Sequence, residues 1–387
     1  MKDENNITTS RIASIDIMCG LVIVLMMLDH VRERFYMHVR PGDPIYETAE
    51  PAFFFTRYLT HFCAPTFIFL AGVSAWLYAH PAAGQFRSPS GFLFKRGFVI
   101  ILFEIVFYYL VWASMFPTFM FLQVLFAIGV SMVALSFACR LNYWIIGGLG
   151  FVIVFGHNLL APIDIASGEP GHVIWAMLHD GGDIFKIGPL TVQLSYPVLP
   201  WFGVIMLGYF AGPVLAQTVS PSTRRVTLIV AGIACLTLLA VLRGFNLYGE
   251  TLPWQVQDTA LATVMSFINF TKYPPSLDYL LLTLGGALLA LAAFDGVKKL
   301  GPILKAIRTF GSVPMFVYLV HLFVLLGAYS VALAVFGPNH GERFGFDNVW
   351  SIWVGAAVLT LAMLPLANMF AAYKHRTKME MPWLSYF

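Results

Sequence analysis

The sequence is dominated by apolar blocks of about 20 residues that recur along its whole length. A helix of about 20 apolar residues spans the roughly 30 Å hydrocarbon core of a bilayer. Of the 387 residues, 59% are hydrophobic and only 11% are charged, and the mean hydropathy is +0.77. A soluble chain of this length would carry about twice that charge. The blocks predict an all-α polytopic membrane protein with ten spans, near residues 15–34, 62–79, 92–113, 116–138, 143–161, 196–216, 226–243, 278–295, 310–336 and 350–373.

The same pattern gives the domain organisation. An eleventh span, short or re-entrant, is compatible with residues 253–271. The first block ends in Asp-His-Val-Arg-Glu-Arg rather than in small residues, so we do not expect a cleaved signal peptide. We expect one transmembrane domain over residues 15–373, between a cytoplasmic N-terminal segment (1–14) and a cytoplasmic C-terminal tail (374–387).

The distribution of Lys and Arg predicts the orientation. With ten spans and the N-terminus inside, fifteen of these residues fall on the inner side and eight on the outer side. Because cytoplasmic loops are enriched in Lys and Arg, we expect a multi-pass membrane protein with both termini in the cytoplasm. The net charge of +3 reflects this bias and does not indicate a nucleic-acid partner.

The four cysteines lie in or beside apolar blocks. Their spacing matches no metal motif, and their depth in the membrane argues against disulfides. We therefore expect no metal cofactor. The long outer loops, residues 35–61, 162–195 and 244–277, are rich in aromatic residues and contain His, Asp and Trp, so we expect an acceptor to bind on that side.

Ionisable residues at both ends of the first block, "IDIMCGLVIVLMMLDHVRERF", suggest function, because charges in a span are costly. At about 100° per residue, His30 lies within about 40° of Asp16 and about 20° of Cys19. One stripe of this helix should therefore carry Asp16, Cys19 and His30 from the inner to the outer side. Asp29 should point elsewhere, to cap a neighbour or pair with an arginine. The alternative is that Asp29 and His30 are only the wet end of a helix.

Three further polar residues fall in or beside spans. His61 lies at the mouth of the second block and His321 in the middle of the ninth. A lone buried histidine is most often only hydrogen-bonded, so structural and site roles stay open for both. Glu104 should bond to another helix, with Gln123 as a candidate partner.

Four segments carry a resemblance to a known family: "RIASIDIMCGLVIVLMMLDHVRERF", "LTHFCAPTFIFLAGVSAWL", "YPVLPWFGVIMLGYFAG" and "NFTKYPPSLDYLLLTLGGALL". The sequence resembles the bacterial DUF1624 group. That group is similar to heparan-α-glucosaminide N-acetyltransferase and belongs to the transmembrane acyltransferase superfamily. The resemblance covers about residues 11–373. It implies transfer of an acetyl or other acyl group from cytosolic acyl-CoA to an amine or hydroxyl, often of a sugar, at the opposite face.

The resemblance also implies site residues. The first-span histidine of the related acyltransferase pattern falls on His30, and the arginine that holds CoA eleven residues earlier is replaced here by Cys19. A catalytic histidine in the first outer loop of the eukaryotic enzyme leaves His30, His38 and His61 as alternatives.

Acyl transfer needs a base for the attacking group and stabilisation of an oxyanion. Histidine is suited to the first task because its pKa near 6.5 leaves much of it neutral at cellular pH. We expect His30 to be the general base, oriented by Asp29 or another carboxylate, with His61 or His321 as oxyanion donor or relay. Direct transfer and an acyl-histidine intermediate both remain open.

Charged and aromatic residues supply candidates for binding. On the CoA side, Lys95, Arg96 and Arg308 are candidates because phosphates bind cations. Asp16 and Cys19 are added because they lie on the first-span stripe with His30.

On the acceptor side, the string "TKYPPSLDYLLLTLG" predicts an extended approach to the eighth span. It would place Lys272, Tyr273 and Asp278 at the outer mouth, and Arg243 and Trp254 could contact a sugar.

Two other function classes stay open. A proton-coupled transporter or exporter could use Asp16, Glu104 and the histidines as a relay, although we detect no internal symmetry. A non-catalytic family member is the third reading. A homodimer is compatible with the sequence, which does not define the acceptor or the acyl chain length.

Overall fold

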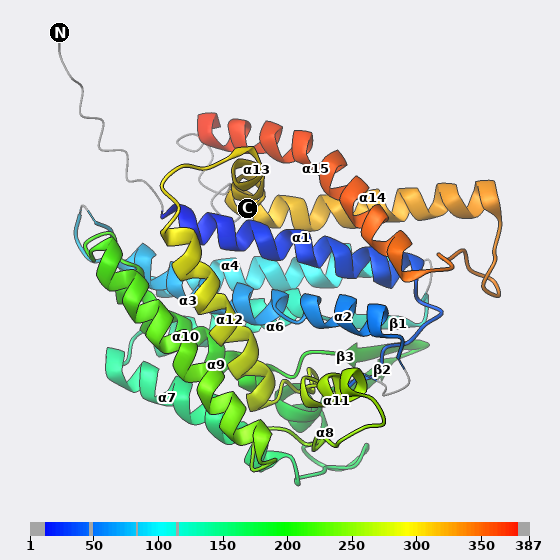
Figure 1. Cartoon of the computed structure of the whole chain (residues 1–387), viewed down its shortest axis with the longest axis horizontal. Helices are drawn as coiled ribbons and strands as arrows, with labels where there is room; N and C mark the ends of the chain where they lie inside the picture. The colour runs from blue at the N-terminus through cyan, green and yellow to red at the C-terminus, as the bar shows by residue number, and fades with distance from the viewer. Residues whose placement is uncertain (1–11, 46–48, 83, 114–115, 378–387) are drawn as a thin grey trace.

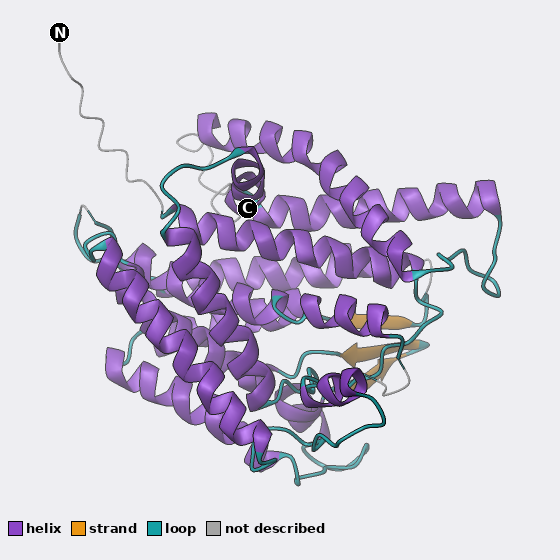
Figure 2. Cartoon of the chain, viewed as in Figure 1, coloured by secondary structure: helices purple, strands orange, loops and turns teal. Residues whose placement is uncertain are grey.

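The computed structural model describes residues 12–45, 49–82, 84–113 and 116–377. Most of these residues are helical (Figure 2). The predicted terminal segments therefore lie partly outside the described residues. Seven helical stretches are long and apolar enough to cross a membrane: Ala13–Phe35, Pro51–Ala79, Tyr143–Leu160, Pro221–Gly244, Leu277–Asp295, Pro314–Phe336 and Val349–Thr377.

Shorter apolar helices, Val124–Ala138 and Leu199–Leu215, add to these seven, so the count of ten spans and the orientation stay predictions. The proposed eleventh segment contains only the eight-residue helix α11 (Ala260–Phe267). Eight residues extend about 12 Å as a helix, well short of the hydrocarbon core.

Helix α1 (Ala13–Phe35) is the centre of the molecule, and most of its residues are buried. Figure 1 shows it between two groups of helices. On one side lie α13 (Pro302–Ser312), α14 (Pro314–Phe336) and α15 (Val349–Thr377), and on the other α3 (Cys63–Ala79), α4 (Ser90–Phe103) and α6 (Val124–Ala138).

The other elements complete the shell around this core. Helices α10 and α12 pack side by side and cross the bundle at a tilt, and α7 packs on α9 (Figure 1). The remaining helices are α2 (Pro51–Thr60), α5 (Tyr109–Trp112), α7 (Tyr143–Gly156), α8 (His172–Trp175), α9 (Val198–Ala211), α10 (Pro221–Gly244) and α12 (Leu277–Asp295).

Glycines let the central helices pack backbone to backbone. A Cβ on Gly20 of α1 would overlap the carbonyl oxygen of Ile307 in α13, and one on Gly311 would overlap that of Asp16. The same reciprocal contact joins α3 and α9 through Gly72 and Gly208. Small residues at helix interfaces allow this approach in membranes.

A small sheet corrects the expectation of an all-α fold. Strand β1 (Phe119–Leu122) pairs in parallel with β3 (Leu190–Leu194), which pairs antiparallel with β2 (Gly182–Ile187). The span predicted over 116–138 therefore begins as a strand, and its helix starts only at Val124. Leu122, Val192 and Leu194 pack together in one apolar cluster. One face of the sheet is therefore buried by residues that do not follow a helical repeat. The sheet lies at the end of the molecule where α1 ends (Figures 1 and 2).

Candidate functional site

A cavity of about 850 Å³ follows α1 through the molecule. Ile12 lines it just before the helix begins, and Ile15, Cys19, Ile23, Met26 and His30 line it on successive turns. Eighteen residues from Ile12 to His30 rise about 27 Å, which is most of the thickness of a bilayer core. We call the part beside the N-terminus of α1 the vestibule and the part beside His30 the deep end.

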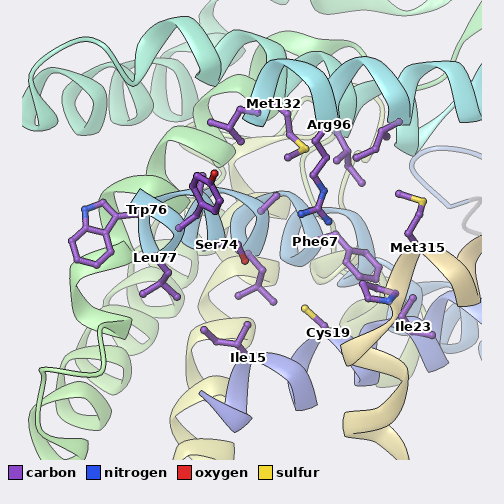
Figure 3. A pocket seen from close by; sticks show the side chains of 18 of the residues that line it. Ile15, Cys19, Ile23, Phe67, Ser74, Trp76, Leu77, Arg96, Met132 and Met315 are labelled. Atoms are coloured by element: carbon purple, nitrogen blue, oxygen red, sulfur yellow. The ribbon is translucent and has the colours of Figure 1, made fainter. Parts of the chain in front are cut away.

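Side chains from several helices meet across this cavity (Figure 3). Cys19 of α1 and Ser74 of α3 lie on one wall, and the Arg96 side chain extends into the space from α4 on the opposite side. Phe67 and Met315 cover much of the wall nearer the deep end. In this part of the cavity, apolar side chains form much of the lining and the Arg96 guanidinium reaches inward.

Two histidines from distant helices are joined at the deep end. His30 Nδ1 of α1 lies 2.6 Å from His321 Nε2 of α14, and the two rings are parallel. His321 Nδ1 lies 2.8 Å from the carbonyl oxygen of Val317, which can only accept, so this nitrogen must donate. In neutral His321 the Nε2 atom is then the acceptor, and His30 Nδ1–H donates to it.

This hydrogen-bond pattern fixes the tautomer of His30. With the proton on Nδ1, the lone pair is on Nε2, which has no hydrogen-bond partner among the described residues. His30 also lines the cavity. Tyr318 packs edge-on against both imidazole rings, with centroids 5.8 Å from His30 and 5.7 Å from His321, and so holds their orientation. In this tautomer Nε2 is the nitrogen of His30 that can accept a proton.

Asp29, one residue before His30, is held by two arginines. Its carboxylate lies 2.8 Å from Arg32 Nε and 2.9 Å from Arg57 Nη1. Pairing with an arginine was one of the two roles predicted for this residue. The structure also corrects the expectation that Asp29 or another carboxylate orients His30. His30 is oriented by its hydrogen bond with His321. The i, i+1 spacing points the two side chains in different directions.

A tight turn before α12 places Lys272 at the same end of the cavity. Asp43 accepts from the backbone N–H of Lys272 at 2.9 Å and from that of Tyr273 at 2.7 Å. The Tyr273 hydroxyl donates to the Tyr196 hydroxyl at 3.1 Å. Lys272 is 3% exposed, and its Nζ lies 5.1 Å and 5.8 Å from the ring centroids of Tyr273 and Tyr196.

A second cavity, of about 490 Å³, lies beyond the deep end on the side of the sheet. Arg57, Asp43 and Tyr273 line it together with Asp180 and Gln193. We call it the outer cavity, and we call the contacts of Asp29 with Arg57 and of Tyr196 with Tyr273 the partition. Asp29 and Tyr196 line the main cavity, whereas Arg57 and Tyr273 line the outer one. The two cavities therefore meet within one layer of side chains.

The surroundings of Asp43 raise the pKa of its carboxyl group. Desolvation by the surrounding protein raises the pKa of this carboxyl to about 6, although the residue as a whole keeps part of its surface exposed. The two backbone amides and the Arg57 guanidinium act in the opposite direction but do not cancel the effect.

The vestibule combines aromatic rings with cations. The rings of Trp76 and His80 stack with centroids 4.2 Å apart, and the Arg87 guanidinium lies 3.8 Å from the centroid of Tyr78. Lys374 of α15 also lines this end. Flat rings suit a purine base and cations suit phosphates, so the vestibule can hold a nucleotide.

Several residues predicted to bind CoA lie elsewhere. Cys19 and Arg96 line the cavity, but Asp16 faces α13, with its Oδ2 atom 3.7 Å from Arg308 Nε. The stripe predicted on α1 therefore holds for Cys19 and His30 and is wrong for Asp16. Lys95 is exposed and lines neither cavity.

The predicted acceptor residues are also divided. Lys272 and Tyr273 lie at the junction of the two cavities. Arg243 instead donates to backbone carbonyls, among them Leu252 at 2.6 Å, and Trp254 Nε1 donates to the carbonyl of Arg243. Asp278 is 1% exposed and packs beneath Gly249. These last three predicted residues line neither cavity.

Two other polar residues serve packing. His61 lies in the turn between α2 and α3, and its ring packs beside Tyr58 and Tyr279. Its side chain lines neither cavity, so the structure does not bring it into the His30 pair. Glu104 accepts from the backbone N–H of Gln123 at 2.5 Å, as predicted.

Sequence reasoning missed two residues of the partition, Arg57 and Tyr196, and also Asp43, which holds the turn beside it. Arg57 was counted only as an outer-loop charge, although a cation within "FFFTRYLTHF" is a signal of function in a span. Tyr196 and Asp43 carry no signal in the sequence, because their partners come from a turn more than 75 residues away.

The comparison with known families settles the class of the protein. Residues 11–241 match the family described as heparan-alpha-glucosaminide N-acetyltransferase, catalytic. The chain belongs to this family. Membership supports an acyltransferase activity in a membrane protein rich in apolar helices. No curated protein matches the chain. Within this acetyltransferase family member, His30 and Arg96 fall in the matched region, whereas Lys272 and His321 lie beyond it.

Proposed function

We propose that this protein is a membrane acetyltransferase that uses acetyl-CoA from the vestibule side to acylate an amine or hydroxyl, as on an amino sugar, in the outer cavity. The observation that carries the proposal is the His30 imidazole, whose Nδ1 is held by His321, at the deep end of a long cavity and one layer of side chains from a second cavity. The positive-inside bias supports a cytosolic vestibule.

The donor fits the main cavity by shape and charge. Acyl-CoA has a charged nucleotide, a long narrow arm and a thioester at the far end. The vestibule offers stacked rings and cations to the nucleotide, and the apolar walls suit the arm. Arg96 reaches into the cavity across from Cys19, and so supplies a cation where the related acyltransferase pattern has an arginine on the first span (Figure 3).

His30 would act as general base. The acceptor nitrogen or oxygen attacks the thioester carbon and forms a new bond, while the carbonyl electron pair moves onto oxygen. His30 Nε2 takes the proton of the attacking group, and its charge is shared with His321 through the 2.6 Å hydrogen bond. When the carbon–sulfur bond breaks, the proton passes from His30 to the leaving thiolate. No covalent acyl-enzyme is needed in this sequence.

The acceptor would approach from the outer cavity. Asp180, Gln193 and Asp43 offer acceptors for hydroxyl and ammonium groups, and Arg57 offers a donor. Contact with the thioester requires the partition to open or the acceptor to reach through it.

Purified protein in nanodiscs, incubated with radiolabelled acetyl-CoA and glucosamine as the acceptor probe, tests the proposal. We expect specific acetyl-CoA binding, release of CoA that increases with glucosamine, and loss of release in His30→Asn. Absence of acetyl-CoA binding would contradict the proposal. Proton-coupled solute uptake into vesicles without CoA release would favour the transporter instead.

A further inference from the structure

The charge on Lys272 is unusual for its location. The side chain is buried, and its Nζ makes no hydrogen bond or ion pair with any residue in the described ranges. Burying an ammonium without a carboxylate is costly, and cation–π contact with Tyr196 and Tyr273 offsets only part of that cost. A residue with only a structural role would be replaced there by an apolar one at no loss.

The carboxylates near the Lys272 ammonium are engaged with other groups. Asp29 is engaged by Arg32 and Arg57, and Arg32 also lies 3.3 Å from Glu33. Asp43 uses its two oxygens on backbone N–H groups of the turn. The ammonium therefore keeps its charge available for a group in the cavity.

The backbone holds Lys272 in a fixed place. Besides the bond to Asp43, the preceding residue Thr271 donates its N–H to Glu250 at 2.9 Å and accepts from the N–H of Ser276 at 3.0 Å. Ser276 also donates its hydroxyl to Glu250 at 2.7 Å. The turn is thus braced on both sides of Lys272, so its ammonium is preorganised, as electrostatic catalysis requires.

We propose that Lys272 is a catalytic residue that stabilises the oxyanion formed on the acetyl carbonyl during transfer. The inference rests on the proposed function, because it needs a thioester at the deep end, where Lys272 and His30 line the same cavity. As the attacking group bonds to the carbonyl carbon, the oxygen gains a negative charge and lies against the ammonium. When the thiolate leaves, the electron pair on the oxygen re-forms the carbon–oxygen double bond. Lys272 neither gains nor loses a proton.

Two neutral variants, Lys272→Met and Lys272→Gln, test this role in the full chain, with Lys272→Arg as the variant that keeps the charge. The control is Lys186→Met, which removes an exposed lysine on β2. We expect kcat to fall about 100- to 1,000-fold in the neutral variants, as for loss of one oxyanion donor. The arginine variant should keep part of the rate, and the dissociation constant of acetyl-CoA should change little.

A second measurement does not depend on the acceptor. Infrared spectra of bound [1-13C]acetyl-CoA report the polarisation of the thioester carbonyl. We expect the band of the wild-type complex to lie at lower wavenumber than that of free acetyl-CoA, and to return toward the free value in the neutral variants.

An unshifted band in the wild-type complex would overturn the role of Lys272. So would neutral variants that raise only the KM for glucosamine, since that result would mean acceptor binding. If wild-type protein binds no acetyl-CoA, the proposed function itself fails. Normal turnover in the neutral variants would overturn the role of Lys272 but leave the proposed function standing.

Discussion

His30 and His321 are 291 residues apart in the chain, yet His30 Nδ1 lies 2.6 Å from His321 Nε2 at the deep end of the main cavity. The pair joins α1 to α14, and His30 lines the cavity. The donor role of His321 Nδ1 toward Val317 sets the direction of the hydrogen bond. Each half of the pair therefore has a different predicted task.

His30→Asn should lower the rate of acetyl transfer by about 100- to 10,000-fold, because it removes the general base. Asparagine still donates a hydrogen bond, so the helix should keep its place and acetyl-CoA should still bind. Scintillation assay of labelled product and titration of acetyl-CoA measure the two effects. The control is His375→Asn, an exposed position near the end of α15. Full activity in the His30 variant would exclude it as the base.

His321→Asn should have a smaller effect of a different kind. As a positioning residue, His321 fixes the tautomer of His30 and shares its positive charge during transfer. We expect kcat to fall about 10- to 100-fold with the KM for acetyl-CoA unchanged, and the pH–rate profile to shift. Tyr329→Phe, on the same helix and outside the cavity lining, is the matched control. An unchanged pH–rate profile would argue for packing alone.

Arg96→Met should raise the dissociation constant of acetyl-CoA about 10- to 100-fold, because a charge-assisted hydrogen bond contributes about 1.5–3 kcal/mol. Its neighbour Lys95 is exposed and lines neither cavity, so Lys95→Met should bind normally. Isothermal titration at two salt concentrations measures both variants. Equal affinities in the two variants would count against the CoA role of Arg96.

The Asp29–Arg57 contact predicts non-additive stability. Asp29→Asn leaves the buried Arg57 without its carboxylate and Arg32 with Glu33 alone, which costs about 3–5 kcal/mol for a broken buried pair. In Asp29→Asn/Arg57→Gln part of that cost should return, since fewer uncompensated charges remain. Thermal unfolding of the single and double variants in detergent completes the cycle. Strict additivity would show that the two side chains are not coupled.

Asp43 predicts a pH dependence of stability. Its pKa of about 6 in the folded protein exceeds the ordinary value of 3.8, so the folded state binds the proton more tightly. The stabilisation is therefore fully present below about pH 3.8 and is lost as pH rises through about 6. The Tm of the wild type should fall more between about pH 4 and 6 than that of Asp43→Asn. Asp164→Asn, in an exposed loop, should behave as the wild type; identical slopes in all three would refute the assignment.

The sequence by itself determined that this chain is a helical membrane protein and marked His30 as a candidate site residue. Apolar blocks long enough to cross a bilayer are a local property, and the cost of a polar residue in a span is read from the residue alone. The family relation also follows from sequence, because its matched segment runs from residue 11 to 241.

Only the tertiary structure decided which polar residues meet. The sheet, the His30–His321 pair and the Asp29–Arg57 contact all join segments far apart in the chain. Helical periodicity gives the direction of a side chain on its own helix but not the helix that faces it. For that reason it placed Asp16 with Cys19 and His30, whereas close packing at Gly20 and Gly311 turned that part of α1 toward α13.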